Sequence, residues 1–385
     1  MNTKNTIFGQ ILQLISRYKF QKAVKETKSE KGAKGFSSWS HFVSLLFAQL
    51  SGQTGLRGIS TGINSQATNL YHLGIKPVKV STLSYANNAR PNELFQKMFE
   101  VLLMKVMLIA PSHKFRFKNP LYSMDSTTID LCLSLYNWAK FRKKKAGIKL
   151  HVKLDHNGYL PKVVVLSEAK KNDVKVGREI SFQKDDLVVF DRGYNDYRLF
   201  LTYCIKGVYF VTRLKKNAKY KVVASHDVSK YENISSDQII RFTGSNAKKN
   251  CPVELRRIRS RDPETGKWIV ILTNNFSWSP ATVAAIYKER WQIEIFFKMM
   301  KQNLKIKSFF GTSKNAVLSQ IWVALITYLL LSFLKFMSQK GWTIYSLMSI
   351  LSTLLFIKRD LWDWLNEPFG SRKIQISGQP ELDFG

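Results

Sequence analysis

Residues 122–135, YSMDSTTIDLCLSL, and residues 186–194, DLVVFDRGY, carry the pattern that decides the fold. Both read as β-strands rich in apolar or β-branched residues, and each places an aspartate inside or directly after its apolar run. Two further strand candidates, IKLHVKLD (148–155) and GYLPKVVVLSE (158–168), lie between them and meet at Asn157-Gly158. Asn-Gly between two such runs is a strong signal for a β-hairpin. Three consecutive strands therefore precede DLVVF.

Helices separate the later strands. We expect a short helix over residues 174–180, a second over residues 196–206, and then a fifth strand, VYFVTRL (208–214). Strand, strand, strand, helix, strand, helix, strand is the order of a ribonuclease-H-like core. The sequence predicts an α/β fold with a ribonuclease-H-like mixed sheet, an inserted β-rich segment and a preceding all-α N-terminal domain.

The hydrophobic periodicity divides the chain into five segments. We expect a helical N-terminal domain (1–115), a first part of the α/β core (116–214), a β-rich insertion (215–278), a second part of the core with a long helix (279–340), and a helical C-terminal region and tail (341–385).

Two short helices around a Gly74–Pro77 turn, the second ending in SYANNAR (84–90), have the layout of a helix-turn-helix DNA reader. A plain corner of a helical bundle explains the same pattern, and the sequence leaves both readings open.

The charge balance of the 385 residues points to a polyanionic partner. Lys and Arg number 60 against 27 Asp and Glu, a formal net charge of +33. Nucleic acid is the first hypothesis and an anionic membrane surface the second. The apolar run 321–334 has 14 residues, fewer than the roughly 20 that span a bilayer, so we expect a buried helix in a soluble, cytoplasmic chain. Three scattered cysteines without CxxC spacing favour neither a disulfide framework nor a zinc site.

Three carboxylates stand out by their positions. Asp125 lies inside the first strand, where an unpaired charge is costly. Asp191 ends a strand that is apolar on both faces and therefore expected at the centre of the sheet. Ligands of such sheets collect at the carboxyl ends of the strands. Glu294 lies in the middle of a helix that Ser279-Pro280 begins, with serine as the cap and proline in the first turn. We expect this helix to run to about Leu304.

That helix carries two neighbouring stripes. At about 100° per residue, four polar residues share a stripe roughly 60° wide; they are Tyr287, Arg290, Glu294 and Lys301. The adjacent stripe is apolar and is expected to pack on the sheet; it comprises Ile286, Ile293, Phe297, Met300 and Leu304. Trp291, on the other side of the polar stripe, is expected to pack as well.

Tyr287-x2-Arg290-x3-Glu294-x6-Lys301 resembles the YREK signature of the DDE transposases of bacterial insertion sequences, the IS-4 family. YSMDSTTIDL, VVFDRGY and the basic stretch WAKFRKKKAGIKLHVKLD are also similar to that family. The resemblance extends over roughly residues 5 to 345. It implies that the N-terminal domain (1–115) binds DNA and that residues 116–214 and 279–340 form the catalytic core.

The resemblance implies a site and its cofactor. Asp125, Asp191 and Glu294 would be catalytic and would bind two Mg²⁺ ions, for which Mn²⁺ could substitute. Mg²⁺ prefers hard oxygen ligands, so three carboxylates suffice without histidine or cysteine. Tyr287 and Arg290, together with Lys301, would hold phosphates near the end of the element.

Further DNA contacts are expected from position. Lys143, Lys144 and Lys145 follow the first aspartate in a basic run. Arg257 and Arg259, together with Arg256 and Arg261, belong to a strand of the insertion that we expect to face DNA. Relatives stack a flipped base on an aromatic side chain of the insertion region. Of Trp268 and Trp278, Trp268 is our candidate for that contact, and packing in the core is the alternative role for it.

The resulting prediction is a cut-and-paste transposase that binds the terminal inverted repeats of its insertion sequence. It would act as a homodimer on transposon ends and target DNA, in the bacterial cytoplasm near the nucleoid, with a hairpin intermediate implied by the resemblance alone. A DDE-type nuclease without strand transfer and a DNA-binding protein with a dead site are the alternatives. The second of these predicts binding without Mg²⁺ and no cleavage.

Overall fold

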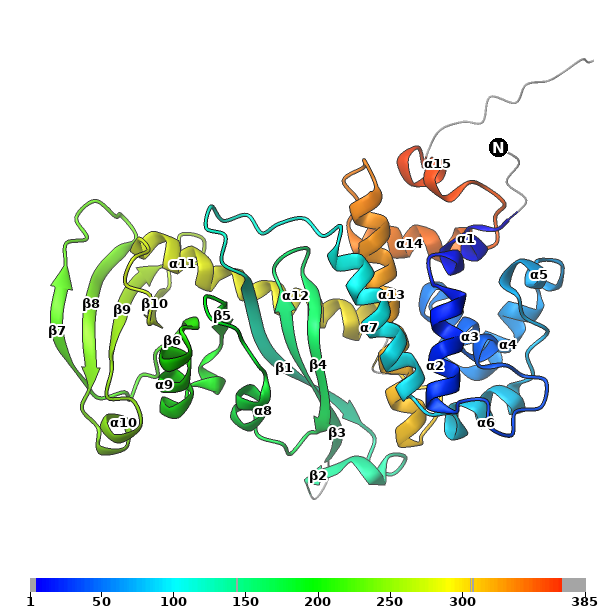
Figure 1. Ribbon diagram of the computed structural model, residues 1–385, viewed down its shortest axis with the longest axis horizontal. Helices are drawn as coiled ribbons and strands as arrows, with labels where there is room; N and C mark the ends of the chain where they lie inside the picture. Colours follow the sequence, from blue (N-terminus) through cyan, green and yellow to red (C-terminus); the bar gives the residue numbers. More distant parts are fainter. Residues whose placement is uncertain (1–4, 143–144, 305, 307, 369–385) are drawn as a thin grey trace, which may run out of the picture.

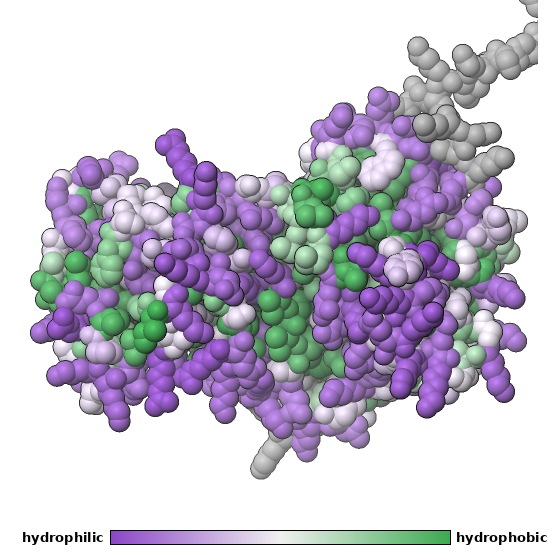
Figure 2. All heavy atoms as spheres, viewed as in Figure 1, coloured by the Kyte–Doolittle hydropathy of each residue, from purple (hydrophilic) through white to green (hydrophobic). Residues whose placement is uncertain are grey.

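The computed structural model describes residues 5–142, 145–304, 306 and 308–368. Figure 1 shows two bodies side by side, a helical body containing the N-terminal helices and a body built on one large sheet. Hydrophilic side chains cover most of the face in Figure 2, with apolar side chains showing between the two bodies. The protein is therefore a mixed α/β molecule with a helical N-terminal region.

Ten strands form the sheet, in the order β2-β3-β1-β5-β6-β10-β9-β8-β7, with β4 also paired to β3. The first six are β1 (Leu121–Leu131), β2 (Lys140–Arg142), β3 (Lys145–Asp155), β4 (Leu160–Glu168), β5 (Leu187–Phe190) and β6 (Tyr209–Arg213). β1, β5 and β6 are parallel, whereas β3 is antiparallel to both β1 and β4. The expected strands and the hairpin at Asn157-Gly158 are confirmed.

The segment 215–278 extends this same sheet. It contains β7 (Tyr220–His226), β8 (Ile234–Phe242), β9 (Glu254–Arg261), β10 (Trp268–Thr273) and a short helix, α10 (Ser245–Asn250). β10 pairs antiparallel with β6, so the insertion continues the sheet at its edge instead of forming a separate barrel or sandwich.

Helices cover both faces of the central strands. Along β5, Val188 and Phe190 pack against α8 (Asp173–Glu179) and α9 (Tyr197–Lys206). Leu187 and Val189 pack on the other face, with the apolar side of α11 (Pro280–Glu289). Side chains alternate along a strand, so a strand covered on both faces must be apolar throughout. This explains the run LVVF and confirms the central place expected for it.

The helical body is built around α13 (Lys314–Met337). This helix packs against α3 (Ser38–Ser51), α6 (Val80–Ala89), α7 (Glu93–Met107) and α14 (Ile344–Leu354). The other helices of this body are α1 (Ile7–Gln13), α2 (Arg17–Thr27), α4 (Leu56–Asn64), α5 (Leu70–Leu73) and α15 (Leu361–Asn366). α13 is long and apolar enough to cross a membrane, but 94% of its most apolar window is buried. The buried helix expected over 321–334 is confirmed.

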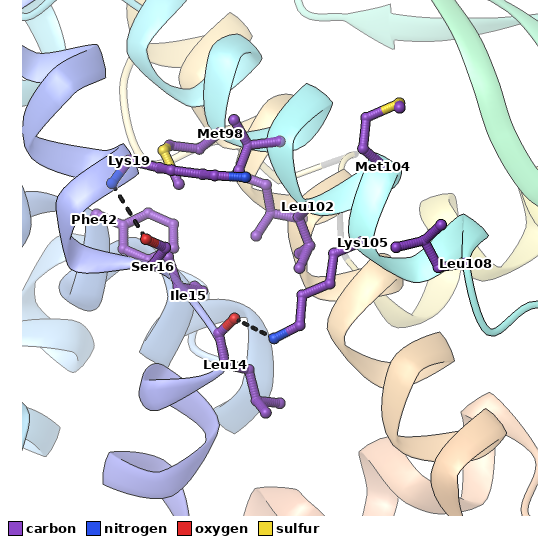
Figure 3. Close-up of a pocket in the computed structure, with 12 residues that line it drawn as sticks. Leu14, Ile15, Ser16, Lys19, Phe42, Met98, Leu102, Met104, Lys105 and Leu108 are labelled. Carbon is purple, nitrogen blue, oxygen red and sulfur yellow. Dashed lines mark hydrogen bonds between the residues drawn. The ribbon is translucent and has the colours of Figure 1, made fainter.

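An apolar pocket of about 330 Å³ opens in the helical body beside α7. Figure 3 shows Leu102 and Met104 of α7, with Leu108 directly after that helix, on one side of it and Ile15 on the other. Lys105 Nζ donates to the Leu14 carbonyl at 2.9 Å. All of its lining residues belong to the helical body, so the pocket is separate from the sheet and its aspartates.

His41, inside α3, makes stability depend on pH. Burial, helped by the charge of Arg90, lowers the pKa of His41 to about 3. The folded chain therefore keeps it neutral, whereas the unfolded chain protonates it near pH 6.5. Stability falls as pH decreases below that value, by about 2 kcal/mol between pH 7 and pH 5 for this group. We expect the difference in unfolding free energy between wild type and His41→Gln to shrink by that amount at pH 5, as urea denaturation would measure. An unchanged difference at the two pH values would contradict the assignment.

Candidate active site

Asp125 and Asp191 lie where the parallel pairing of β1 with β5 ends. Asp125 is inside β1, and Asp191 directly follows β5. β1 and β5 pair in register as far as Met124 and Phe190, and each aspartate is the next residue. Because side chains alternate, Asp125 points to the face opposite Met124, and Asp191 to the face opposite Phe190. That is the face on which Leu187 and Val189 pack with α11.

Glu294 approaches this face from the helix that follows the insertion. Ser279 caps α11 by accepting from the Thr282 amide, and Pro280 stands in its first turn, as expected. The helix is interrupted at Arg290 and continues as α12 (Trp291–Lys298), which packs against β1. The predicted apolar stripe is buried from Ile286 to Leu304. Trp291 is 57% exposed, so the prediction that it packs is wrong.

Arg290 joins two of the carboxylates. Its Nη2 lies 2.6 Å from Glu294 Oε1, and its Nη1 lies 3.7 Å from Asp125 Oδ2. Its Nε is buried without a hydrogen-bond partner in the described chain. The guanidinium thus supplies a positive charge between two acids and keeps one donor unused.

Electrostatics connect all three acids. The pKa of Asp125 is raised to about 6, first by burial and then by the negative charges of Asp191 and Glu294. The Ser126 amide and Arg290 act in the opposite direction. The negative charges of both other predicted ligands therefore act on Asp125, as expected for carboxylates that lie near one another.

The donor set fits a hard divalent cation in its chemistry, since it consists of carboxylate oxygens. The acids are spaced here as their ion pairs with Arg290 hold them. No three acidic, histidine or cysteine side chains among the described residues are close enough to share an ion. Arg290 stands between Asp125 and Glu294, so a shared cation would require this side chain to move.

Two charged or polar neighbours complete the face. Tyr287 is buried, and its ring lies 5.9 Å from the Arg290 guanidinium carbon. Burial raises the pKa of Tyr287; the charge of Asp191 acts in the same direction, whereas Arg290 and Arg213 lower it. Arg213 ends β6, the parallel neighbour of β5. Like Asp191, it directly follows the last residue of its strand in the pairing of β5 with β6. Sequence reasoning missed Arg213, although its position at a strand end could have indicated it.

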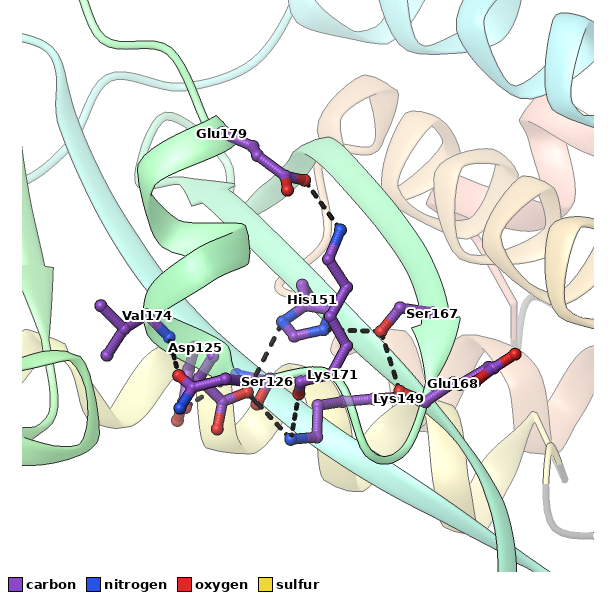
Figure 4. Close-up of polar contacts among 11 residues, drawn as sticks. Asp125, Ser126, Lys149, His151, Ser167, Glu168, Lys171, Val174 and Glu179 are labelled. Atoms are coloured by element: carbon purple, nitrogen blue, oxygen red, sulfur yellow. Dashed lines mark hydrogen bonds and ion pairs between the residues drawn. The ribbon is translucent and has the colours of Figure 1, made fainter. Parts of the chain in front are cut away.

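A second polar cluster lies behind Asp125, on the α8 side of β1 (Figure 4). Ser126 Oγ donates to Asp173 Oδ1 at 2.6 Å, and Lys149 Nζ lies 3.2 Å from the same oxygen. His151 Nε2 is bonded to Ser167 Oγ at 3.0 Å, with Nδ1 3.6 Å from Asp173. These contacts hold β1, β3, β4 and α8 together beside Asp125. The alternation Lys149-x-His151 was visible in the sequence, but its partner Asp173 was not.

Lys301 lies in a π-helical turn, η4 (Met299–Asn303). A π turn holds more residues than an α turn, so Lys301 is rotated from the position that α-helical spacing gives it relative to Glu294. The expected continuous α-helix to Leu304 is therefore wrong in its last turn. π turns inside helices occur frequently at functional sites.

The predicted DNA contacts of the basic run cannot be placed. Lys143 and Lys144 lie outside the described residues, and Lys145 begins β3. They stay predictions.

The arginines of β9 divide between the two faces of the sheet. Arg257, Arg259 and Arg261 share one face by alternation. Arg257 donates to Ser236 Oγ and Gln238 Oε1, whereas Arg259 is exposed and lies 4.6 Å from the Trp268 ring centroid. Trp268 begins β10 and is partly exposed. Arg256 points to the other face, where it is buried against Asp237, so the expectation that it faces DNA is wrong.

Known proteins match most of the chain. The family described as "Transposase DDE domain" matches residues 116–330, and a domain of unknown function, DUF4372, matches residues 3–76. A Sinorhizobium fredii protein named as a transposase is 31% identical over 283 residues, covering 72% of this chain and 78% of the relative. A Geobacillus stearothermophilus protein named as a transposase of an insertion sequence element is 29% identical over 287 residues, 74% of each chain.

A Synechocystis protein, also named for an insertion sequence element, is 25% identical over 301 residues, covering 75% of this chain and 82% of the relative. A solved synaptic complex of piggyBac transposase with hairpin DNA overlaps at a TM-score of 0.44 and 10% identity, over 96% of this chain and 81% of that one. A likeness of that size carries no argument about this chain.

Proposed function

We propose that this chain, which belongs to the family of transposase DDE domains, uses Asp125, Asp191 and Glu294 to cut and join DNA at the ends of an insertion sequence. Members of the family are enzymes of DNA cleavage and strand transfer that work with divalent metal ions. The observation that carries the residue assignment is the shared face. The two aspartates directly follow the last paired residues of the parallel strands β1 and β5, and the charge of Glu294 acts on Asp125 from α12.

The three carboxylates would hold two Mg²⁺ ions. When bound, such ions stabilise the attacking and leaving oxygens of an in-line displacement at phosphorus. The charges of both other acids act on Asp125. Asp125 is therefore our candidate for the residue that would bind both ions.

Arg290 would exchange partners when DNA binds. In the protein alone its guanidinium neutralises Asp125 and Glu294. With cations at the carboxylates, the Arg290 guanidinium would no longer be needed to neutralise them. Its donors, including the unused Nε, would then bind a phosphate in bidentate fashion. Tyr287 fixes one side of Arg290, and Lys301 would add a further positive charge for the same backbone.

The order β4-β3-β1-β5-β6 supports a ribonuclease-H-like core, because three strands in chain order form one side and two parallel strands the other. We further propose cut-and-paste transposition by a homodimer that binds terminal inverted repeats and target DNA, with a hairpin intermediate and an IS-4 relationship taken from the resemblance. The net charge of +33 supports the DNA partner. A cytoplasmic, nucleoid-associated location follows from that partner.

The proposal is tested by cleavage of labelled duplexes taken from the DNA that flanks the gene, with Mg²⁺ or with EDTA. We expect cutting at one defined junction, loss of cutting in EDTA, and no cutting by Glu294→Gln, because the amide removes a charged oxygen ligand. Glu264→Gln, an exposed glutamate of the insertion, is the matched control and should cut normally. Specific binding by the wild type without cutting would identify a DNA-binding protein with a dead site instead.

A further inference from the structure

The start of α6 is fixed to α4 by buried side-chain bonds. Asn64 accepts from the Val78 amide at 2.8 Å and donates to the Val78 carbonyl at 3.0 Å. Ser60 Oγ donates to the same carbonyl at 2.6 Å. Val78 stands two residues before α6, so the two helices are joined at a set angle instead of through a loose linker.

The inner face of α6 is held by packing and hydrogen bonds within the helical body. Leu83 and Ala86 are buried apolar residues. Asn87 Oδ1 is bonded to His41 Nε2 at 2.6 Å, and Arg90 Nη1 donates to the Ser37 carbonyl at 2.6 Å. Every side chain on this side of α6 has its packing or polar partners within the helical body.

The outer face of α6 carries polar side chains that make no hydrogen bond to the described part of the chain. Ser81, Tyr85 and Asn88 are exposed at spacings of four and three residues, so they lie in one stripe. Their side chains make no hydrogen bond to the described part of the chain, and Tyr85 is 74% exposed. Exposed faces of helices usually carry charges, as α2 does with Lys22, Lys25 and Glu26, but this stripe carries none.

The surroundings of the stripe are positive. No acidic residue occurs between Glu30 and Glu93. Lys76 and Lys79, directly before α6, are exposed, and so is Arg57 in the first turn of α4. A surface with cations around an uncharged stripe of hydroxyl, phenol and amide groups complements a duplex, whose phosphates are negative and whose base edges are neutral donors and acceptors.

We propose that α6 is the helix that reads DNA sequence, with Tyr85 and Asn88 contacting base edges and Lys76 and Lys79 contacting phosphates. α6 lies at the lower edge of the helical body in Figure 1. Asn88 is suited to adenine, which an amide can bind through two hydrogen bonds. This inference rests on the proposed function, since it names the part of the chain that selects the DNA to be cut.

The test uses the full chain and measures binding to labelled duplexes of the DNA flanking the gene and to scrambled duplexes of the same composition. Wild type should prefer the flanking duplex. Tyr85→Ala and Asn88→Ala should each reduce that preference about tenfold, with little change in binding to the scrambled duplex. Lys79→Ala should weaken binding to both duplexes and make the salt dependence shallower. Tyr18→Ala, an 80% exposed tyrosine on α2, is the matched control and should behave as wild type.

Unchanged preference in both Tyr85→Ala and Asn88→Ala would overturn the assignment, as would a wild type that binds the two duplexes equally. Equal loss on both duplexes would overturn it too, since that result denotes general binding. Cleavage separates this failure from failure of the proposed function. If wild type cuts with Mg²⁺ while the α6 variants keep their selectivity, only the reading helix is wrong. If wild type is selective but does not cut, only the enzymatic proposal is wrong.

Discussion

Asp125→Asn is expected to lower the rate of DNA cleavage by about 10³-fold or more, with no loss of binding to DNA. The substitution keeps the size and shape of the side chain but removes the charge that interacts with those of Asp191 and Glu294. Electrostatic groups that act on a transferring phosphoryl group are worth this much when one is removed. Single-turnover cleavage of the flanking duplex measures the rate, and a gel-shift titration measures binding.

Asp130→Asn is the matched control, because Asp130 lies on the same strand but is exposed and distant from the acids in register. It should cut as wild type does. Removing a buried charge with a raised pKa should also leave Asp125→Asn at least as stable as wild type. Full cleavage by Asp125→Asn, or equal loss in the two variants, would show that the shared face is not the reacting site.

Asp237→Asn is expected to lower the free energy of unfolding by about 3–5 kcal/mol, because it leaves the buried Arg256 without its counter-charge. Arg256 holds Asp237 through two bonds, from Nε at 2.8 Å and from Nη2 at 2.6 Å. It also donates to the Trp278 carbonyl at 2.6 Å. The pair therefore joins β8 and β9 to the segment that leads into α11. Urea denaturation measures the loss.

Glu254→Gln provides the comparison on the same two strands. Glu254 pairs with Arg241 at 2.7 Å, but both side chains are partly exposed to solvent. Breaking that pair should cost less than about 1 kcal/mol. If Asp237→Asn destabilises no more than Glu254→Gln, Arg256 is not a structural residue and its expected role in DNA contact would have to be reconsidered.

The central sheet could be predicted because each of its strands has a recognisable pattern within a few consecutive residues. The apolar and β-branched run of β1, the Asn-Gly turn between β3 and β4, and the doubly apolar β5 are each visible in a few consecutive residues. The same rules placed Asp125 inside the first strand and Asp191 at the end of a central one. The buried stripe of α11 and α12 could be predicted from helical periodicity, which depends only on neighbours along the chain.

The remainder depends on contacts between distant segments. Arg256 and Arg257 are adjacent in sequence, and only the pairing of β9 with β8 decides which of them meets Asp237. The ion pair between Arg290 and Asp125 joins α12 to β1, so no local pattern could show that the arginine stands between the acids. The π turn at Lys301 was hidden for a similar reason, because α-helical spacing was assumed up to Leu304.

The most direct test of the central claim is to locate the bound metal on the polypeptide. Fe²⁺ in place of Mg²⁺, with ascorbate and peroxide, generates radicals that cut the backbone beside the ion. We predict cuts near residues 125, 191 and 290–294, suppressed by excess Mg²⁺ and absent in Asp125→Asn. Cuts that avoid these three segments, or that persist unchanged under excess Mg²⁺, would contradict the claim that Asp125, Asp191 and Glu294 form one metal-binding site.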